Sequence, residues 1–231
     1  MPKKPSSIPT LDHERAAGFP EGIVIGVDEV GRGCLAGPVM AGAFAFPWDG
    51  EMPAWLSRVR DSKLLSPRVR EELATLLESW TPYWSVAEAT VAEIDQLNIL
   101  NAVELAMSRA VDRVRQRIVE DLGPSAGGRI RILVDGNRVP KPFRGSASAI
   151  VGGDRLCLSI ACASILAKVS RDRFLEKLDS LHPGYGLAVH KGYGTPAHLE
   201  SLRRLRPCPE HRRSFAPVRL AEDAVPGMSE G

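Results

Sequence analysis

The sequence lacks any hydrophobic run long enough to cross a membrane. Within its 231 residues, no apolar segment approaches the roughly 20 residues that a spanning helix needs. Lys3 and Lys4 stand near the start, but no apolar stretch follows them, which argues against a secretory signal. We therefore expect a cytoplasmic protein that does not associate with membranes.

Cysteine is also scarce. The chain has four cysteines, and none of them forms a CxxC pair or a zinc-binding spacing. Cys208 and His211 lie close together in the sequence, but no second pair of ligands is nearby, so we treat them as unrelated to metal. Without an export signal, the cysteines are expected to be reduced thiols.

An excess of one charge is missing too, since the formal net charge is only +2. Composition alone therefore does not indicate a nucleic-acid-binding protein. The charge is nevertheless unevenly distributed, because residues 203–213 hold one glutamate, Glu210, among several arginines. These arginines are Arg203, Arg204, Arg206, Arg212 and Arg213. Such a run is typical of a solvated surface, and a nucleic-acid contact is the alternative.

What is present is the composition of an ordinary globular protein, with 44% hydrophobic and 25% charged residues. The length favours one domain of generous size, or one domain with an appended segment. Residues 1–20 are rich in proline, serine and charge, and we expect them to form a disordered arm. Residues 221–231 are predicted to be a flexible tail, which leaves residues 21–220 as one folded domain.

Between these ends, the pattern of short apolar runs and helical periodicity indicates an α/β fold. The predicted strands cover residues 23–27, 39–46, 84–89 and 130–134. Predicted helices begin at residue 67, cover residues 91–119 with a break near Asn98, and cover residues 159–181. The last of these carries small residues on a face that can pack closely. A loop rich in glycine, proline and histidine follows from His182 and leads to a basic helix.

Two of the predicted strands end in carboxylates. Residues 23–27 stop at Asp28 and Glu29, and residues 130–134 stop at Asp135. For any one of these acids, the capping of a turn is the simpler explanation. If the two strands are neighbours in one sheet, however, their carboxyl ends place the acids side by side, where open α/β sheets bind ligands.

Clustered carboxylates repel one another unless a cation neutralises them. Asp154 follows two glycines and precedes a helix, so it is the natural fourth member, with a helix cap as the alternative. Oxygen ligands favour Mg²⁺ or Mn²⁺ over zinc. Two such ions are the usual device for hydrolysing a phosphodiester, one activating the water and the other stabilising the leaving oxygen.

The segments around these acids resemble the signatures of the prokaryotic ribonuclease HII family. The matching segments are residues 28–33 (DEVGRG), 35–39 (LAGPV), 61–64 (DSKL), 134–137 (VDGN), 153–154 (GD), 163–172 (ASILAKVSRD), 185–186 (YG), 190–195 (HKGYGT) and 211–215 (HRRSF). They occur in the family's order and extend over about residues 23–218. One segment alone is only suggestive, whereas the ordered set is highly specific.

The resemblance implies an RNase H-like fold, in which helices flank a mixed β-sheet and a helical segment follows at the C-terminus. It implies an endoribonuclease that cuts the RNA strand of RNA–DNA hybrids and incises duplex DNA on the 5′ side of a single ribonucleotide, leaving 5′-phosphate and 3′-hydroxyl ends. Matched by motif, Asp28, Glu29, Asp135 and Asp154 are the catalytic acids and hold two Mg²⁺ or Mn²⁺ ions. Asp172 is a candidate for an additional acid near the site.

The resemblance also implies the substrate contacts. Gly31, Arg32 and Gly33 match the loop that senses the ribonucleotide 2′-hydroxyl, the group by which proteins distinguish RNA from DNA. Glycine suits that task because backbone groups can approach a sugar closely, and a plain tight turn is the alternative. Tyr193 matches the tyrosine that stacks on the sugar of the following deoxynucleotide, with simple packing as the alternative. Expected contacts to phosphates are Lys63, Lys168 and Arg171.

The chain departs from the family pattern at two positions. Gly152 stands where lysine is usual, so one positive charge near the site is missing, and Cys34 stands where proline is common. These departures affect the expected substrate affinity and loop conformation, but no metal-binding acid. The expected partner of this monomer is nucleic acid, either an RNA–DNA hybrid or DNA with embedded ribonucleotides. Alternatives are another nuclease of this fold, such as a type 1 ribonuclease H or a junction resolvase, and a non-catalytic hybrid-binding module.

Overall fold

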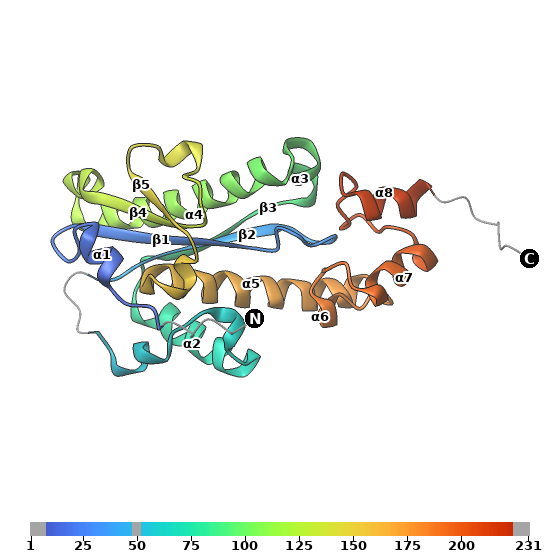
Figure 1. Cartoon of the computed structure of the whole chain (residues 1–231), viewed down its shortest axis with the longest axis horizontal. Coiled ribbons are helices and arrows are strands. Elements are labelled where there is room, and N and C mark those ends of the chain that lie inside the picture. The colour runs from blue at the N-terminus through green and yellow to red at the C-terminus, as the bar shows by residue number, and fades with distance from the viewer. Residues whose placement is uncertain (1–7, 48–51, 224–231) are drawn as a thin grey trace, which may run out of the picture.

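A five-stranded mixed sheet lies at the centre of the structure, a computed structural model that describes residues 8–47 and 52–223 (Figure 1). The strands are β1 (Ile23–Val30), β2 (Val39–Ala45), β3 (Trp84–Ala89), β4 (Ile130–Asp135) and β5 (Ala147–Ile150). Their order across the sheet is β3-β2-β1-β4-β5. The first three strands are antiparallel neighbours, whereas β4 runs parallel to both β1 and β5. This arrangement confirms the predicted α/β fold with a mixed sheet.

The register of β1 and β4 decides where the acids lie. Val27 pairs with Val134 in this parallel ladder, so the next residues, Asp28 and Asp135, lie at the same end of the sheet. β1 continues through Glu29 before its last residue, Val30. The sheet therefore brings together the two acid-ending strands that the sequence analysis treated as possible neighbours.

Helices cover both faces of the sheet (Figure 1). They are α1 (Asp12–Ala16), α2 (Pro67–Trp80), α3 (Val91–Leu97), α4 (Ile99–Leu122), α5 (Leu158–Leu181), α6 (Leu187–His190), α7 (Pro196–Leu205) and α8 (Ala216–Asp223). α4 packs on one face through a core of small and β-branched side chains, and α5 with α2 packs on the other. The predicted break near Asn98 is confirmed, because Asn98 has a φ of 68° and separates α3 from α4.

Two glycines in the central strands allow α5 to lie close to the sheet. A Cβ atom at Gly26 would clash with the backbone of Ser159, and one at Gly42 would clash with the backbone of Ala163. The helix presents Ala163 and Ala167 at this contact, which confirms the predicted small-residue face. Close packing fixes the position of α5 relative to the ends of β1 and β4, because the interior leaves little room for adjustment.

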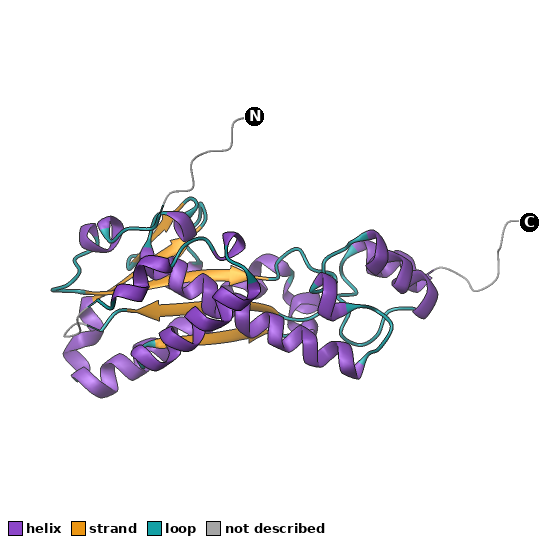
Figure 2. Cartoon of the chain, turned by 90° about the horizontal axis from the view of Figure 1, so that it is seen from below, coloured by secondary structure: helices purple, strands orange, loops and turns teal. Residues whose placement is uncertain are grey.

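α5 extends beyond the sheet into a C-terminal lobe, which we define as residues 182–223 (Figure 2). The lobe has a core of its own, in which Leu175 and Leu178 of α5 pack with Leu187, Leu202 and Val218. Leu35 and Ala36, from the loop between β1 and β2, belong to the same core. The lobe confirms the expected C-terminal helical segment and contacts the loop that follows the acids.

The expected disordered arm is wrong for residues 8–20, which contain α1 and pack on the domain. Glu14 is fully buried, and its Oε1 accepts hydrogen bonds of 2.7 Å from the backbone and the hydroxyl of Ser159. Residues 1–7 lie outside the described residues. The tail begins later than predicted, since α8 continues to Asp223, and residues 224–231 also lie outside the described part. Among the described helices, none is both long and apolar enough to span a membrane.

Candidate active site

Three elements position the four predicted acids. β1 carries Asp28 and Glu29, β4 ends at Asp135, and the 3₁₀ turn η5 (Gly153–Arg155) carries Asp154. The backbone N–H of Gly153 donates a 2.6 Å hydrogen bond to Oδ1 of Asp135, which ties the end of β4 to η5. The structure thus places the four acids around one end of the sheet.

Burial and mutual repulsion both act on these acids. Burial, together with the charges of Asp135, Glu29 and Asp154, holds the pKa of Asp28 well above its usual range. Burial and then Asp135 raise the pKa of Glu29. Burial also raises the pKa of Asp154, against the opposing charge of Lys63. Groups that interact in this way are stabilised as carboxylates by an added cation.

The donor set fits a hard divalent cation. All four groups offer only carboxylate oxygens, which Mg²⁺ and Mn²⁺ prefer. Among the described residues, however, no group of three or more acids, histidines or cysteines is arranged so that it could hold a metal ion without some movement of the side chains. A site of this kind suits ions that keep several waters and bind substrate phosphates alongside one or two carboxylates. Asp28, Glu29, Asp135 and Asp154 are therefore the residues that would hold metal.

An open pocket lies beside Glu29 and Asp135. Arg32, Asn137 and Arg138 are among its lining residues, and α4 contributes several more. The complete lining is Glu29, Arg32, Leu100, Val103, Glu104, Met107, Val134, Asp135, Gly136, Asn137, Arg138 and Pro140. Two of the four acids thus line a pocket that also contains two arginines.

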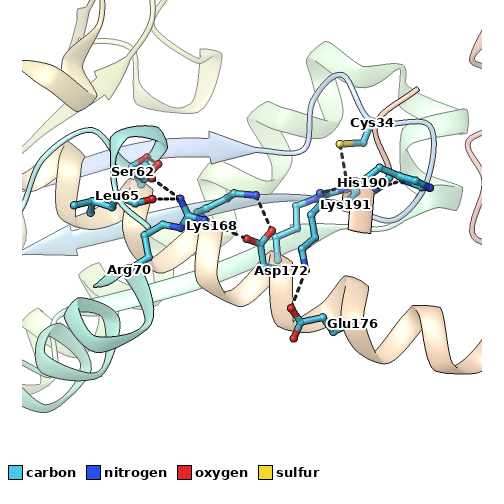
Figure 3. A network of polar contacts seen from close by, with 12 residues as sticks. Cys34, Ser62, Leu65, Arg70, Lys168, Asp172, Glu176, His190 and Lys191 are labelled. Atoms are coloured by element: carbon cyan, nitrogen blue, oxygen red, sulfur yellow. Dashed lines mark hydrogen bonds and ion pairs between the residues drawn. The ribbon is translucent and has the colours of Figure 1, made fainter. Parts of the chain in front are cut away.

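A buried arginine supports the lysine that contacts the acids. Lys63 lies in the 3₁₀ turn η2 (Ser62–Leu64), and its Nζ is 3.3 Å from Oδ2 of Asp154. Arg70 Nη1 donates to the carbonyl oxygens of Ser62 at 2.6 Å and Leu65 at 3.0 Å (Figure 3). These bonds fix the turn that presents Lys63. The side chain of Lys63 is 77% exposed, so it remains available to a phosphate.

Asp172 lies with cations rather than with the four acids. Its Oδ1 is 2.7 Å from Nζ of Lys168 and its Oδ2 is 3.9 Å from Nη2 of Arg70 (Figure 3). Asp172 is thus an ion-pair partner on α5, and its role as an additional acid near the site stays a prediction. Lys168 remains a predicted phosphate contact, although its charge is partly neutralised by Asp172.

The predicted phosphate contact at Arg171 is wrong. Arg171 is fully buried, and its guanidinium group donates to backbone carbonyl oxygens in the interior. Its position on α5 turns it toward the loop between β1 and β2. Arg212, which the sequence analysis placed in a basic run and in the matching segment 211–215, is buried in the same manner. The sequence gives no signal for either burial, because arginine is usually a surface residue.

The predicted substrate-reading residues lie together beyond the acids. Gly31 has a φ of 88°, and a Cβ atom there would clash with the guanidinium group of Arg171. Gly33, in contrast, has no neighbouring atom within 4 Å of the same test position. Arg32 and Gly33 are exposed, and Tyr193, which is 44% exposed, lies opposite Cys34 in an isolated antiparallel bridge. The structure therefore brings the loop and the tyrosine next to each other.

Both departures from the family pattern have a local explanation. Gly152 has a left-handed conformation with a φ of 69°, and Arg155 occupies the space over it. The Nε atom of Arg155 is 3.9 Å from Oδ1 of Asp154, so a positive charge stands near this acid despite the missing lysine. Cys34 is buried, and its thiol lies 3.5 Å from the carbonyl oxygen of Lys191.

Comparisons with known proteins agree on one family. The family model described as ribonuclease HII matches residues 25–218. A ribonuclease HII of Paracidovorax citrulli is 48% identical over 215 residues, covering 93% of this chain and 83% of the relative. One of Rhodospirillum rubrum is 49% identical over 223 residues, covering 95% of each. The crystal structure of ribonuclease H2 from Pyrococcus horikoshii is 28% identical with a TM-score of 0.66, covering 87% of this chain and 97% of that one.

Proposed function

The chain belongs to the ribonuclease HII family, and on that premise we propose that it incises duplex DNA on the 5′ side of a single ribonucleotide as well as cutting RNA–DNA hybrids. Membership of this family makes it a ribonuclease H, a metal-dependent hydrolase. One observation carries the finer proposal. β1 runs from Asp28 and Glu29 directly into the glycines at residues 31 and 33, so acids and sugar-reading loop are nearly contiguous.

We propose that Asp28, Glu29, Asp135 and Asp154 hold two divalent ions, Mg²⁺ or Mn²⁺. The bound ions would supply an activated water and stabilise the departing 3′ oxygen, which leaves 5′-phosphate and 3′-hydroxyl ends. The acids fix the position of the reacting phosphate, since catalysis of this kind depends on placement. Lys63 and Lys168 would hold flanking phosphates through their charge.

Selection of the cleavage site rests on the loop and the tyrosine. The exposed backbone at Arg32 and Gly33 leaves room for a sugar to approach and for its 2′-hydroxyl to be bonded, while Gly31 is buried and holds the loop in place. The exposed ring of Tyr193 would stack on the next sugar, where an additional 2′-hydroxyl would be crowded. Together these groups would favour a step from RNA to DNA over the interior of a long RNA strand.

Three labelled duplexes of one sequence test the proposal. One is all DNA, one has a single ribonucleotide, and one is an RNA–DNA hybrid, each incubated with Mg²⁺ and again with EDTA. Cleavage of the second and third, abolished by EDTA, is expected. Failure to cut the single-ribonucleotide duplex would limit the enzyme to hybrids, as expected of the type 1 alternative. Binding without cleavage in Mg²⁺ would instead support the non-catalytic alternative.

A further inference from the structure

Two buried arginines in the C-terminal half have no acidic partner. Arg171 and Arg212 are both fully buried, and neither forms an ion pair with a carboxylate anywhere in residues 8–47 or 52–223. Burial lowers the pKa of Arg212 to about 10. An unpaired buried charge is costly in free energy unless hydrogen bonds compensate it. The hydrogen-bond acceptors of these two side chains therefore indicate their role.

Both guanidinium groups bind the same short loop, residues 31–38, which we call the glycine loop. Arg212 donates to the carbonyl oxygens of Gly31 at 2.7 Å, Arg32 at 3.0 Å and Gly37 at 2.9 Å. The planar fork of an arginine holds several acceptors in a fixed arrangement. Arg212 therefore constrains the beginning and the end of the loop from one side.

Arg171 constrains the remainder of the loop and joins it to a second segment. It donates to the carbonyl oxygens of Ala36 at 3.0 Å, Pro38 at 3.1 Å and Lys191 at 2.9 Å. Lys191 lies two residues before Tyr193, and we call residues 191–193 the tyrosine segment. One guanidinium group therefore links the glycine loop to the backbone of this segment. Gly192 closes this contact, because a Cβ atom there would lie 2.6 Å from the carbonyl oxygen of Ala36.

Backbone hydrogen bonds also join the glycine loop to the segments on both of its sides. The N–H of Leu35 donates to Gly192 at 2.7 Å, and the carbonyl of Leu35 accepts from Arg212 at 2.9 Å. The N–H of Gly37 donates to Glu210 at 2.9 Å. The glycine loop is thus the central strip between the tyrosine segment and residues 210–212. Its distance from Tyr193 is fixed by these contacts rather than by the flexibility of either loop.

We propose that Arg171 and Arg212 are positioning residues that set the spacing between residues 31–33 and Tyr193, and thereby set the preference for an RNA–DNA step over continuous hybrid. The inference rests on the proposed function, because it concerns how the same site chooses among substrates. Lysine at either position keeps the charge but loses the planar fork that engages three carbonyl oxygens. The substitution should therefore change which cleavage site is preferred, while the positions of the four acids stay the same.

The test compares Arg171→Lys and Arg212→Lys with the wild-type enzyme. Arg206→Lys is the matched control, since Arg206 Nη1 also donates to a backbone carbonyl oxygen in the lobe, that of Ala221 at 2.5 Å, away from the glycine loop. Single-ribonucleotide and hybrid duplexes of one sequence are cut under single-turnover conditions at fixed salt. We define the ratio as the cleavage rate of the single-ribonucleotide duplex divided by that of the hybrid. Both test variants should lower this ratio about tenfold or more, because small displacements at a reacting centre are costly. The control should leave the ratio unchanged.

Equal losses on the two substrates, or an unchanged ratio, would overturn the positioning role. Failure of the proposed function looks different, because the wild type itself would then not cut the single-ribonucleotide duplex. Hydrogen exchange of the wild type provides a second measurement that does not depend on folding of the variants. The amides of Leu35 and Gly37 should exchange as slowly as those of β1, within about tenfold. Exchange at the rate of an open loop would overturn the proposal by itself.

Discussion

The two glycines that flank Arg32 are required for different physical reasons. Gly31 has a positive φ and no space for a Cβ atom, because the guanidinium group of Arg171 lies against it. Gly33 has neither restriction, so the protein's own packing does not explain the glycine there. The open space at Gly33 is instead what a closely approaching sugar would need.

These differences predict opposite outcomes for two alanine substitutions. Gly31→Ala should destabilise the protein by about 1–3 kcal/mol, the usual cost of a strained backbone conformation. Gly33→Ala should leave the unfolding midpoint unchanged and slow cleavage at a single ribonucleotide. Thermal denaturation and single-turnover rates of both variants check the pair, each serving as control for the other. An unstable Gly33→Ala protein with normal cleavage would contradict this division.

Asp135→Asn should nearly abolish cleavage while leaving hybrid binding largely intact. Asp135 stands at the end of β4 and raises the pKa of both Asp28 and Glu29, which shows that it shares their site. Losing one anionic ligand weakens metal binding and displaces the ions, which is costly where catalysis depends on placement. Rates in saturating Mg²⁺ and binding measured in EDTA check both halves. Near-normal turnover would remove Asp135 from the site.

The apolar runs predicted that Asp28 and Asp135 lie at one end of the sheet, whereas the buried arginines could not be predicted. The predicted end of the first strand was too early, because β1 continues through Asp28 and Glu29 to Val30. Nothing in the pattern distinguishes Arg171 inside the protein from Lys168 near its surface, since both lie in the same helical segment. The difference depends on which loop covers that face of α5, and a single chain's periodicity does not contain that information.

At the scale of elements, a relay of buried imidazoles ties the tyrosine segment to residues 208–211. His198 Nδ1 donates to the carbonyl oxygen of Tyr193 at 2.9 Å, so its Nε2 must accept the 3.0 Å bond from His211 Nε2. His211 Nδ1 in turn accepts from the backbone N–H of Cys208 at 3.1 Å. Both rings are therefore neutral, and protonating either one would place two N–H groups against each other.

This relay predicts a loss of stability in mild acid. Burial, and then the nearby His198, lowers the pKa of His211 from 6.5 to about 4. As the pH falls from 6.5, the unfolded chain gains a proton that the folded protein does not accept until about pH 4. The contribution of His211 to the free energy of unfolding should therefore decrease through this window, by about 3 kcal/mol.

Denaturant titrations between pH 7 and 4.5 measure the effect. His211→Asn should be less stable than the wild type at pH 7, and the difference should shrink as the pH falls. His13→Asn, which removes an imidazole of α1 outside the relay, is the control. A pH-independent difference for His211→Asn would contradict the neutral relay.

Elements were predicted where periodicity is strong and missed where they are short. The strand Trp84–Ala89 and the helix that begins at Pro67 agree with their predictions, since alternation and a proline at the first helical turn are clear signals. β5 was missed because Ala147–Ile150 is a short, partly exposed edge strand. α1 was missed because it is short and four of its five residues are polar, and its position depends on the contact of Glu14 with Ser159.

In the whole molecule, α5 connects the four acids with the glycine loop. Near its beginning, Ser164 forms a hydrogen bond with Asp28, which opposes the rise of that acid's pKa. Two turns later Arg171 holds the glycine loop, and Leu175 and Leu178 anchor the C-terminal lobe. One helix, packed closely on the sheet, therefore fixes the positions of the acids and of the glycine loop relative to each other (Figure 1).

The central claim is that the four acids and the glycine loop form one site that recognises a 2′-hydroxyl. Mapping the position of the cut at nucleotide resolution tests this claim most directly. The substrates are a DNA duplex with one ribonucleotide and the same duplex with a 2′-O-methyl group there. With Mg²⁺ we predict a single incision on the 5′ side of the ribonucleotide and none in the methylated duplex. Incision on the 3′ side, or equal cleavage of both duplexes, would contradict the account.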